Sequence, residues 1–257
     1  MRKVSLALTL ILFLVISGML LGLLFYSPLS TLLSSITSPE IQFAILLSLV
    51  TSVASTIICI AIAIPVAYAL ARYTFPGKRI ASLVLTLPLT LPPLVAGIAL
   101  LLFFGTTAWG KALDSAGFPV IFTPIGIIVA EVFVNLPYMV RIMRSTFTAI
   151  NPRFEHVAKT LGCTETGAFF RVSLPMARHG LIAGTVITWS KAMGEFGAVL
   201  MLAGATTMRT ETLPIALYLN ISTGDVDLAI AAATILILIS LVALCTVEYL
   251  DKNVNVF

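Results

Sequence analysis

The sequence predicts an all-α, polytopic membrane protein with about six transmembrane helices and one short cytoplasmic helical segment. Hydrophobic residues make up 59% of the chain and charged residues 10%, whereas about a quarter of the residues in a soluble domain are charged. The mean hydropathy is +1.10. The apolar residues form long runs rich in Leu, Ile and Ala instead of ten-residue alternations, which favours spanning helices over a β-barrel.

Each candidate span holds about 20 apolar residues, the length that a helix needs to cross a bilayer. The predicted spans are Val4–Tyr26, Ile41–Leu70, Ile80–Phe104, Pro119–Val140, Gly180–Ala203 and Leu228–Leu250. The first is longer than a typical signal-peptide core and has no A-x-A site after it, so we expect it to be retained. We interpret residues 1–257 as one transmembrane domain. It comprises an N-terminal helix and outer loop (1–37) and a core (38–250), which includes a cytoplasmic segment (151–175).

Basic residues gather in alternate loops. These residues are Arg2 and Lys3, then Arg72, Lys78 and Arg79, and then Arg141, Arg144, Arg153, Lys159, Arg171 and Arg178. The other loops contain Lys111 and Arg209. Because cytoplasmic loops carry the excess of Lys and Arg, this predicts a multi-pass protein of the cell (plasma or inner) membrane with both termini in the cytoplasm. The net charge of +4 then reflects topology, not binding to nucleic acid.

Prolines interrupt two of the spans. Pro65 lies near the end of the second span, and Pro88, Pro92 and Pro93 lie inside the third. An interior proline removes a helix hydrogen bond and kinks the helix. Two interpretations remain open, a packing adjustment or a flexing helix beside a translocation path.

Charged residues occur inside two predicted spans, where insertion is costly. They are Glu131 in the fourth span and Lys191 and Glu195 in the fifth. Lys191 and Glu195 are four residues apart, so a continuous helix would place them on one face. They form either a buried structural cluster with Glu131 or the polar lining of a translocation path or gate. Gly194 and Gly197 beside them permit close backbone approach.

The cytoplasmic segment reads as a helix–turn–helix. Asn151 and Pro152 predict a helix start, Gly162 a helix end, and Thr164 the cap of a second short helix. The first helix has one apolar face, formed by Phe154, Val157, Ala158 and Leu161. A short amphipathic helix on a membrane protein is typical of a docking element. We expect this apolar face to dock, with Arg153, Glu155 and Lys159 at a solvated rim.

No catalytic or metal-binding pattern accompanies these features. Cys59, Cys163 and Cys245 do not share metal-ligand spacing. The sequence contains no P-loop, no H-E-x-x-H and no G-x-S-x-G. We therefore expect a protein that is not an enzyme and that carries no cofactor or metal of its own.

The cytoplasmic segment resembles the coupling motif of ABC-importer permeases, E-A-A, three residues, Gly, nine residues, I-x-L-P. Here Gly162 is followed after nine residues by Val172-Ser173-Leu174-Pro175, and His156-Val157-Ala158 stands at the E-A-A position. His156 therefore replaces the family's Glu, and Glu155 lies one residue earlier. Residues 38–250 also resemble the molybdate-type permeases, in the runs SPEIQFAILLSL, PVAYALARYTFPGK, PLTLPPLVAGIALLLFFG, KAMGEFGAVLMLAG and TETLPIALYL. Sulfate permeases share much of the GEFGA run.

The resemblance implies a type I ABC-importer permease for molybdate or tungstate. It implies a second copy of this chain, two cytoplasmic ATPase subunits that bind ATP and Mg²⁺, and an extracytoplasmic oxyanion-binding protein. The ATPase-coupling residues would be Arg153, Phe154, Glu155, His156, Val157, Ala158, Leu161 and Gly162. The outer loop Gly204–Asp227 is long enough to meet the external protein, and Pro214 predicts a short surface helix within it.

Two alternatives remain at this point. A sulfate or thiosulfate importer fits the same motifs. A channel or secondary transporter that works without ATP fits the intramembrane charges and the kinked helices, but such a protein has no need of a docking segment.

Overall fold

The computed structural model describes residues 2–26 and 28–252, and these residues form helices, turns and bends without a strand. The longer helices are α1 (Arg2–Leu24), α3 (Pro39–Arg72), α5 (Pro93–Thr106), α7 (Pro124–Ala149), α11 (Arg178–Met193), α13 (Leu213–Thr223) and α14 (Val226–Lys252). The shorter ones are α2 (Leu29–Ile36), α4 (Lys78–Thr86), η1 (Leu87–Leu89), α6 (Ala108–Ser115), α8 (Arg153–Thr160), α9 (Glu165–Ala168), the π-helical η2 (Phe169–Ser173), α10 (Leu174–Met176) and α12 (Gly197–Leu202). The all-α membrane fold is confirmed.

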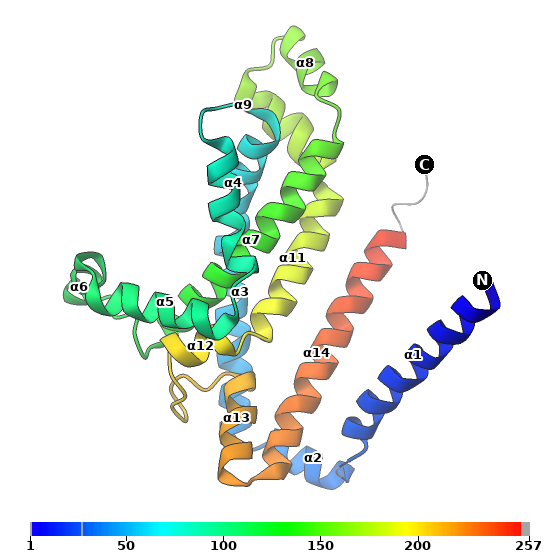
Figure 1. The fold of residues 1–257 in the computed structure, drawn as a ribbon, viewed down its shortest axis with the longest axis vertical. Coiled ribbons are helices and arrows are strands. Elements are labelled where there is room, and N and C mark those ends of the chain that lie inside the picture. The colour runs from blue at the N-terminus through cyan, green and yellow to red at the C-terminus, as the bar shows by residue number, and fades with distance from the viewer. Residues whose placement is uncertain (1, 27, 253–257) are drawn as a thin grey trace.

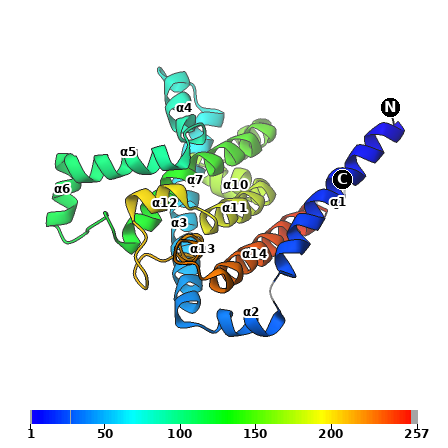
Figure 2. The same cartoon turned by 60° about the horizontal axis from the view of Figure 1, so that its bottom comes forward.

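Helices α3, α7 and α11 run along the long axis of the molecule, with α8 and α9 at one end and α2 and α13 at the other (Figure 1). Helix α14 packs on α11 and α13. Helix α1 has no buried residue and projects away from the rest of the protein (Figure 2). The start of α1 and the end of α14 both point toward the end that carries α8.

The most extensive contact joins α3 and α7. Small side chains on α3, Cys59, Ala63 and Ala67, are fully buried and pack in one cluster with Met139 and Met143 of α7. Because these small residues recur every fourth position, they lie on one face of α3 and let the two backbones approach closely. Pro65 does not interrupt α3.

The third predicted span is not one straight helix. The residues Lys78–Leu89 and Pro93–Thr106 form two helical stretches that meet at an angle of 111°. Pro92 and Pro93 stand at the bend, where neither can donate a backbone hydrogen bond to continue the preceding helix. Helix α5 therefore turns away from the long axis (Figure 1). Four helices are long and apolar enough to cross a membrane, or five spans if the bent pair counts as one, within the described residues.

The fifth predicted span is also divided. Helix α11 ends at Met193, and α12 begins at Gly197. A Cβ on Gly197 would lie 2.9 Å from the Cβ of Pro93, and one on Gly97 would lie 2.8 Å from the backbone oxygen of Ala198. Glycines on both sides thus allow α5 and α12 to touch backbone to backbone. The bend in one span and the break in the other meet at this contact.

The loop 204–227, for which a surface helix was predicted, differs from that prediction. Pro214 does lie in the first turn of α13, but Leu213, Pro214, Ile215 and Ala216 are buried. The backbone N–H of Leu213 donates a 2.8 Å hydrogen bond to Ser48 Oγ of α3. The first turn of α13 is therefore part of the core.

Candidate functional site

The segment of residues 151–175 forms the helix–turn–helix that its sequence predicts. The side chain of Asn151 accepts a 3.0 Å hydrogen bond from the backbone N–H of Arg153, and Gly162 ends the first helix with φ +91°. Thr164 Oγ1 accepts a 3.0 Å hydrogen bond from the N–H of Gly167 and caps α9. These local bonds fix the course of the chain around α8.

Glu155 anchors α8 to the rest of the protein. Its carboxylate accepts hydrogen bonds from Arg72 Nε (2.8 Å), Ser173 Oγ (2.8 Å) and Tyr68 Oη (3.0 Å). Arg72 also donates a 2.9 Å hydrogen bond to the backbone oxygen of Ile150. The carboxylate therefore joins α8, η2 and the end of α3.

The prediction that Glu155 lies at a solvated rim is wrong, because the residue is 6% exposed. Burial opposes its ionisation, but the hydrogen bonds from Arg72, Ser173 and Tyr68 outweigh burial and hold the pKa of this carboxyl below its usual value. Sequence inspection missed this role because Arg72 is 83 positions away. The available signal was a cluster of polar side chains, Tyr68 and Arg72, at the C-terminal end of the second span.

One strip of the exposed surface of α8 is apolar. Phe154, Val157 and Leu161 are 51%, 57% and 80% exposed, and the described part of the protein does not cover them. Ala158, which was expected on this face, is buried because it lies on the side of α8 that carries Glu155. Arg153, His156 and Lys159 are exposed, and Lys159 Nζ lies 3.3 Å from Glu165 Oε1 in a solvated ion pair.

Within the described residues, the intramembrane charges form no ion-paired cluster, which was one of the two interpretations that the sequence left open. Lys191 Nζ lies 4.1 Å from the centroid of the Tyr138 ring, and Glu195 Oε1 accepts a 3.1 Å hydrogen bond from the N–H of Ala198. No ion pair joins either residue to the other or to Glu131 within residues 2–26 and 28–252. The shared helix face is absent because α11 ends at Met193, so Glu195 lies beyond that helix and its carboxylate accepts a hydrogen bond from the first turn of α12 instead. Gly194 is not a close-contact position, since a Cβ there would meet no atom nearer than 3.8 Å.

Glu131 belongs to a buried polar seam between α3 and α7. It is 2% exposed, and its Oε1 accepts a 3.1 Å hydrogen bond from Thr51 Oγ1. The seam continues along α3 through Ser48, Ser52 and Ser55, all buried. Sequence inspection overlooked these hydroxyls, although their spacing of three to four residues on one helix face was a readable signal.

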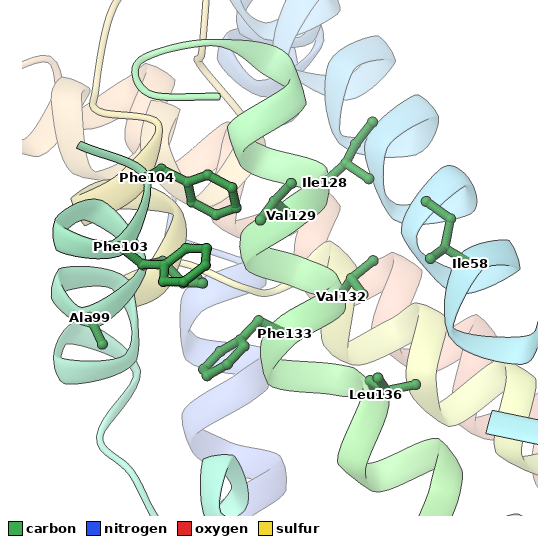
Figure 3. A pocket seen from close by; sticks show the side chains of 10 residues that line it. Ile58, Ala99, Phe103, Phe104, Ile128, Val129, Val132, Phe133 and Leu136 are labelled. Carbon is green, nitrogen blue, oxygen red and sulfur yellow. The ribbon is translucent and has the colours of Figure 1, made fainter. Parts of the chain in front are cut away.

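An apolar cavity of about 590 Å³ opens between α5, α7 and α3. Figure 3 shows its wall, with Phe103 and Phe104 of α5, Phe133 and Val132 of α7, and Ile58 of α3. Its lining residues are all apolar. It therefore offers no group that would hold a hydrated anion.

The comparisons with known proteins agree with this architecture. Residues 61–256 match the family described as "Binding-protein-dependent transport system inner membrane component". The chain is 36% identical over 188 residues to the sulfate transport system permease protein CysW of Synechocystis sp., covering 73% of this chain and 68% of the relative. It is 38% identical over 208 residues to the molybdenum transport system permease protein ModB of Mycobacterium tuberculosis, covering 80% and 78%.

The fold is similar to that of a chain in the crystal structure of a bacterial alginate ABC transporter in complex with alginate pentasaccharide-bound periplasmic protein. The TM-score is 0.74 at 17% sequence identity, and the match covers 98% of this chain and 93% of that one. Because only 17% of the aligned residues are identical, this similarity is evidence for the fold alone. From the family match and the relatives, the chain belongs to the binding-protein-dependent transport system inner membrane components, and it is the permease subunit of an ABC importer with the type I fold.

Proposed function

We propose that this chain is the permease of a molybdate and tungstate importer, and that cytoplasmic ATPase subunits drive it through α8. The observation that carries the coupling is the exposed apolar face of Phe154, Val157 and Leu161 on a helix held in place by Glu155. Exposed apolar side chains on a rigid short helix fit a groove in a partner protein.

A movement of α8 would be transmitted directly to the membrane-spanning helices. Glu155 binds Arg72 and Tyr68 at the end of α3, and α3 packs along α7. Closure of an ATPase dimer on ATP would move α8, and the buried hydrogen bonds would pass that movement to α3 and α7. ATP and Mg²⁺ belong to the ATPase in this mechanism.

The substrate assignment rests on sequence similarity. The runs around GEFGA resemble molybdate-type permeases, and the molybdenum permease of M. tuberculosis is 38% identical to this chain. Sulfate is the second candidate, because the sulfate permease of Synechocystis sp. is 36% identical. Both substrates are tetrahedral dianions. An extracytoplasmic binding protein would select between them before the permease is reached.

Two copies of the chain would enclose the path. The apolar cavity between α5 and α7 supports this arrangement, since a second copy would cover side chains such as Phe103 and Phe133. The path would run beside the contact of α5 with α12, close to Gly197, Glu195 and Lys191. With α8 on the cytoplasmic side, the start of α1 and the end of α14 would also face the cytoplasm.

The deciding experiment is ATPase activity of the complete transporter in lipid nanodiscs, with its binding protein loaded with molybdate, tungstate or sulfate in turn. Stimulation by molybdate and tungstate but not by sulfate is expected. Stimulation by sulfate alone would support the coupling mechanism but would identify sulfate, instead of molybdate or tungstate, as the substrate. An ATPase rate that does not change on addition of any of the loaded binding proteins would contradict the importer mechanism.

A further inference from the structure

A basic cavity lies between α4 and α7, and no residue of α8 lines it. It has a volume of about 380 Å³ and is lined by Lys78, Arg79, Ser82 and Leu83 of α4 and by Arg144 of α7. Arg144 Nη1 donates a 2.7 Å hydrogen bond to Ser82 Oγ, and Lys78 Nζ donates a 2.8 Å hydrogen bond to the backbone oxygen of Tyr73. These bonds hold two of the cations at the cavity.

The positive charge of this cavity is not balanced. Within the part of the chain that the structure describes, Lys78, Arg79 and Arg144 form no ion pair with a carboxylate. Arg72, by contrast, is paired with Glu155. The cations of the cavity come from two helices that the fold brings together, and they leave most of their N–H donors available to an anion.

The start of α4 adds to the positive potential. Lys78 is the first residue of this nine-residue helix, and no side chain caps the helix start at Gly77. The first backbone N–H groups of a helix attract anions, through their free hydrogen bonds and through the helix dipole. The cavity lies against the first two turns of α4.

The surface beside the cations is apolar. Ile80, Leu83, Val84 and Leu87 of α4 and η1 are 68%, 62%, 63% and 55% exposed. Basic side chains at one end of a helix and exposed aliphatic side chains along the rest match the two parts of a phospholipid, a charged headgroup and its acyl chains. A soluble anion would make no use of the aliphatic part.

We propose that this cavity binds the phosphate of an anionic phospholipid, with the acyl chains lying along α4. Arg79 and Arg144 present planar guanidinium groups that suit a phosphate, and Lys78 adds a compact charge. The bound lipid would hold α4 against α7 on the cytoplasmic side. A free tetrahedral oxyanion has the same headgroup chemistry, so the experiment must separate the two sources.

The test is native mass spectrometry of the full-length chain in detergent, titrated with phosphatidylglycerol or with phosphatidylcholine of the same chain length. The wild-type protein should retain phosphatidylglycerol more tightly. Arg144→Gln and Lys78→Gln should each weaken that binding about fivefold, the effect expected of one cation near a lipid phosphate. Arg171→Gln removes an exposed cation outside the cavity and should leave the binding unchanged.

A second arm uses free oxyanions as competitors. Molybdate, sulfate or inorganic phosphate at millimolar concentration should not displace the lipid. Arg144→Lys keeps the charge and should retain the preference for phosphatidylglycerol, which separates loss of charge from misfolding. Equal affinity for both lipids, equal losses in Arg171→Gln and Arg144→Gln, or displacement by a free oxyanion would each overturn the proposal.

Discussion

Glu155 is the residue on which the position of the segment 151–175 depends. Its carboxylate is the acceptor that its described neighbours Arg72, Ser173 and Tyr68 share. Removing one member of a buried ion pair leaves the other charge desolvated, which costs about 3–5 kcal/mol. An exposed pair contributes far less, about 0–1 kcal/mol. Substitution of Glu155 should therefore destabilise the segment far more than substitution of Glu165.

Glu155→Ala should release α8. Cys163 is half-buried and its backbone N–H binds the oxygen of Ala158 at the end of α8, so its thiol reports on local opening. With the exposed Cys245 replaced by Ser, maleimide labelling of Cys163 should become at least tenfold faster in Glu155→Ala. The control Glu165→Ala breaks the solvated pair with Lys159 and should change the rate less than twofold. Equal rates in both variants would contradict the anchoring role.

The same carboxylate predicts a pH dependence. Its pKa lies below the usual value in the folded state, whereas an unfolded glutamate titrates near about 4.3. The ionised group therefore stabilises the segment at neutral pH, and this contribution is lost as the pH falls through the folded-state pKa. Glu155→Gln cannot titrate at this position.

Hydrogen exchange of the α8 amides, corrected for intrinsic exchange rates, measures this contribution. Wild type should be better protected than Glu155→Gln at pH 7, with a constant difference down to about pH 4.3. The difference should then shrink as the pH falls further. If the difference in protection between wild type and Glu155→Gln grows as the pH falls, the ionised carboxylate does not stabilise the segment.

At the scale of the element, α8 presents two unlike sides. Ala158 faces the protein, so a charge there would disturb the fold of the segment and could not report on docking. Val157 is 57% exposed and is the better probe of the docking face.

Val157→Asp should leave the permease folded and weaken its binding to the ATPase subunits at least tenfold, because docking would bury an unpaired carboxylate. Thr160→Asp places the same charge on an exposed position of α8 outside the apolar face and should retain binding. Affinity of the purified permease for the ATPase, measured in detergent, distinguishes the two. Normal binding of Val157→Asp would exclude this face as the docking surface.

The contact of α5 with α12 predicts that alanine substitutions at two nearby glycines, Gly197 and Gly194, change the stability of the protein unequally. A Cβ on Gly197 would lie 2.9 Å from Pro93 Cβ and 3.0 Å from the backbone nitrogen of Leu94, whereas one on Gly194 would meet nothing closer than 3.8 Å. Gly197→Ala should therefore destabilise the protein by about 1–3 kcal/mol through overpacking. Gly194→Ala should be neutral, and thermal unfolding in detergent compares them. A loss of stability in Gly194→Ala alone would place the close contact elsewhere.

At the scale of the whole molecule, the apolar cavity predicts self-association. Phe103 is 48% exposed at its wall, and burying a carboxylate there without a partner is unfavourable. Phe103→Asp should shift the detergent-solubilised permease from dimer to monomer in light scattering coupled to size exclusion. Leu83→Asp on α4, outside this cavity, should remain dimeric. A dimeric Phe103→Asp variant would show that the two copies meet on another face.

The sequence by itself determined the fold class, most of the helix positions and the helix–turn–helix around Gly162. These features follow from composition, apolar run length and local hydrogen bonding, which act between residues close together in the chain. Proline positions likewise pointed to the third span, although they did not give the 111° angle between its two parts.

Only the tertiary structure decided which polar groups meet. The partners of Glu155 and of Glu131 lie 83 and 80 positions away, and no local pattern encodes such pairs. The break after Met193 removed Glu195 from the helix face that carries Lys191, and α12 meets α5 through Gly97 and Gly197. The same assembly placed Arg144 beside Lys78 and Arg79. Side-chain partners depend on how whole helices pack, and packing is a property of the folded chain.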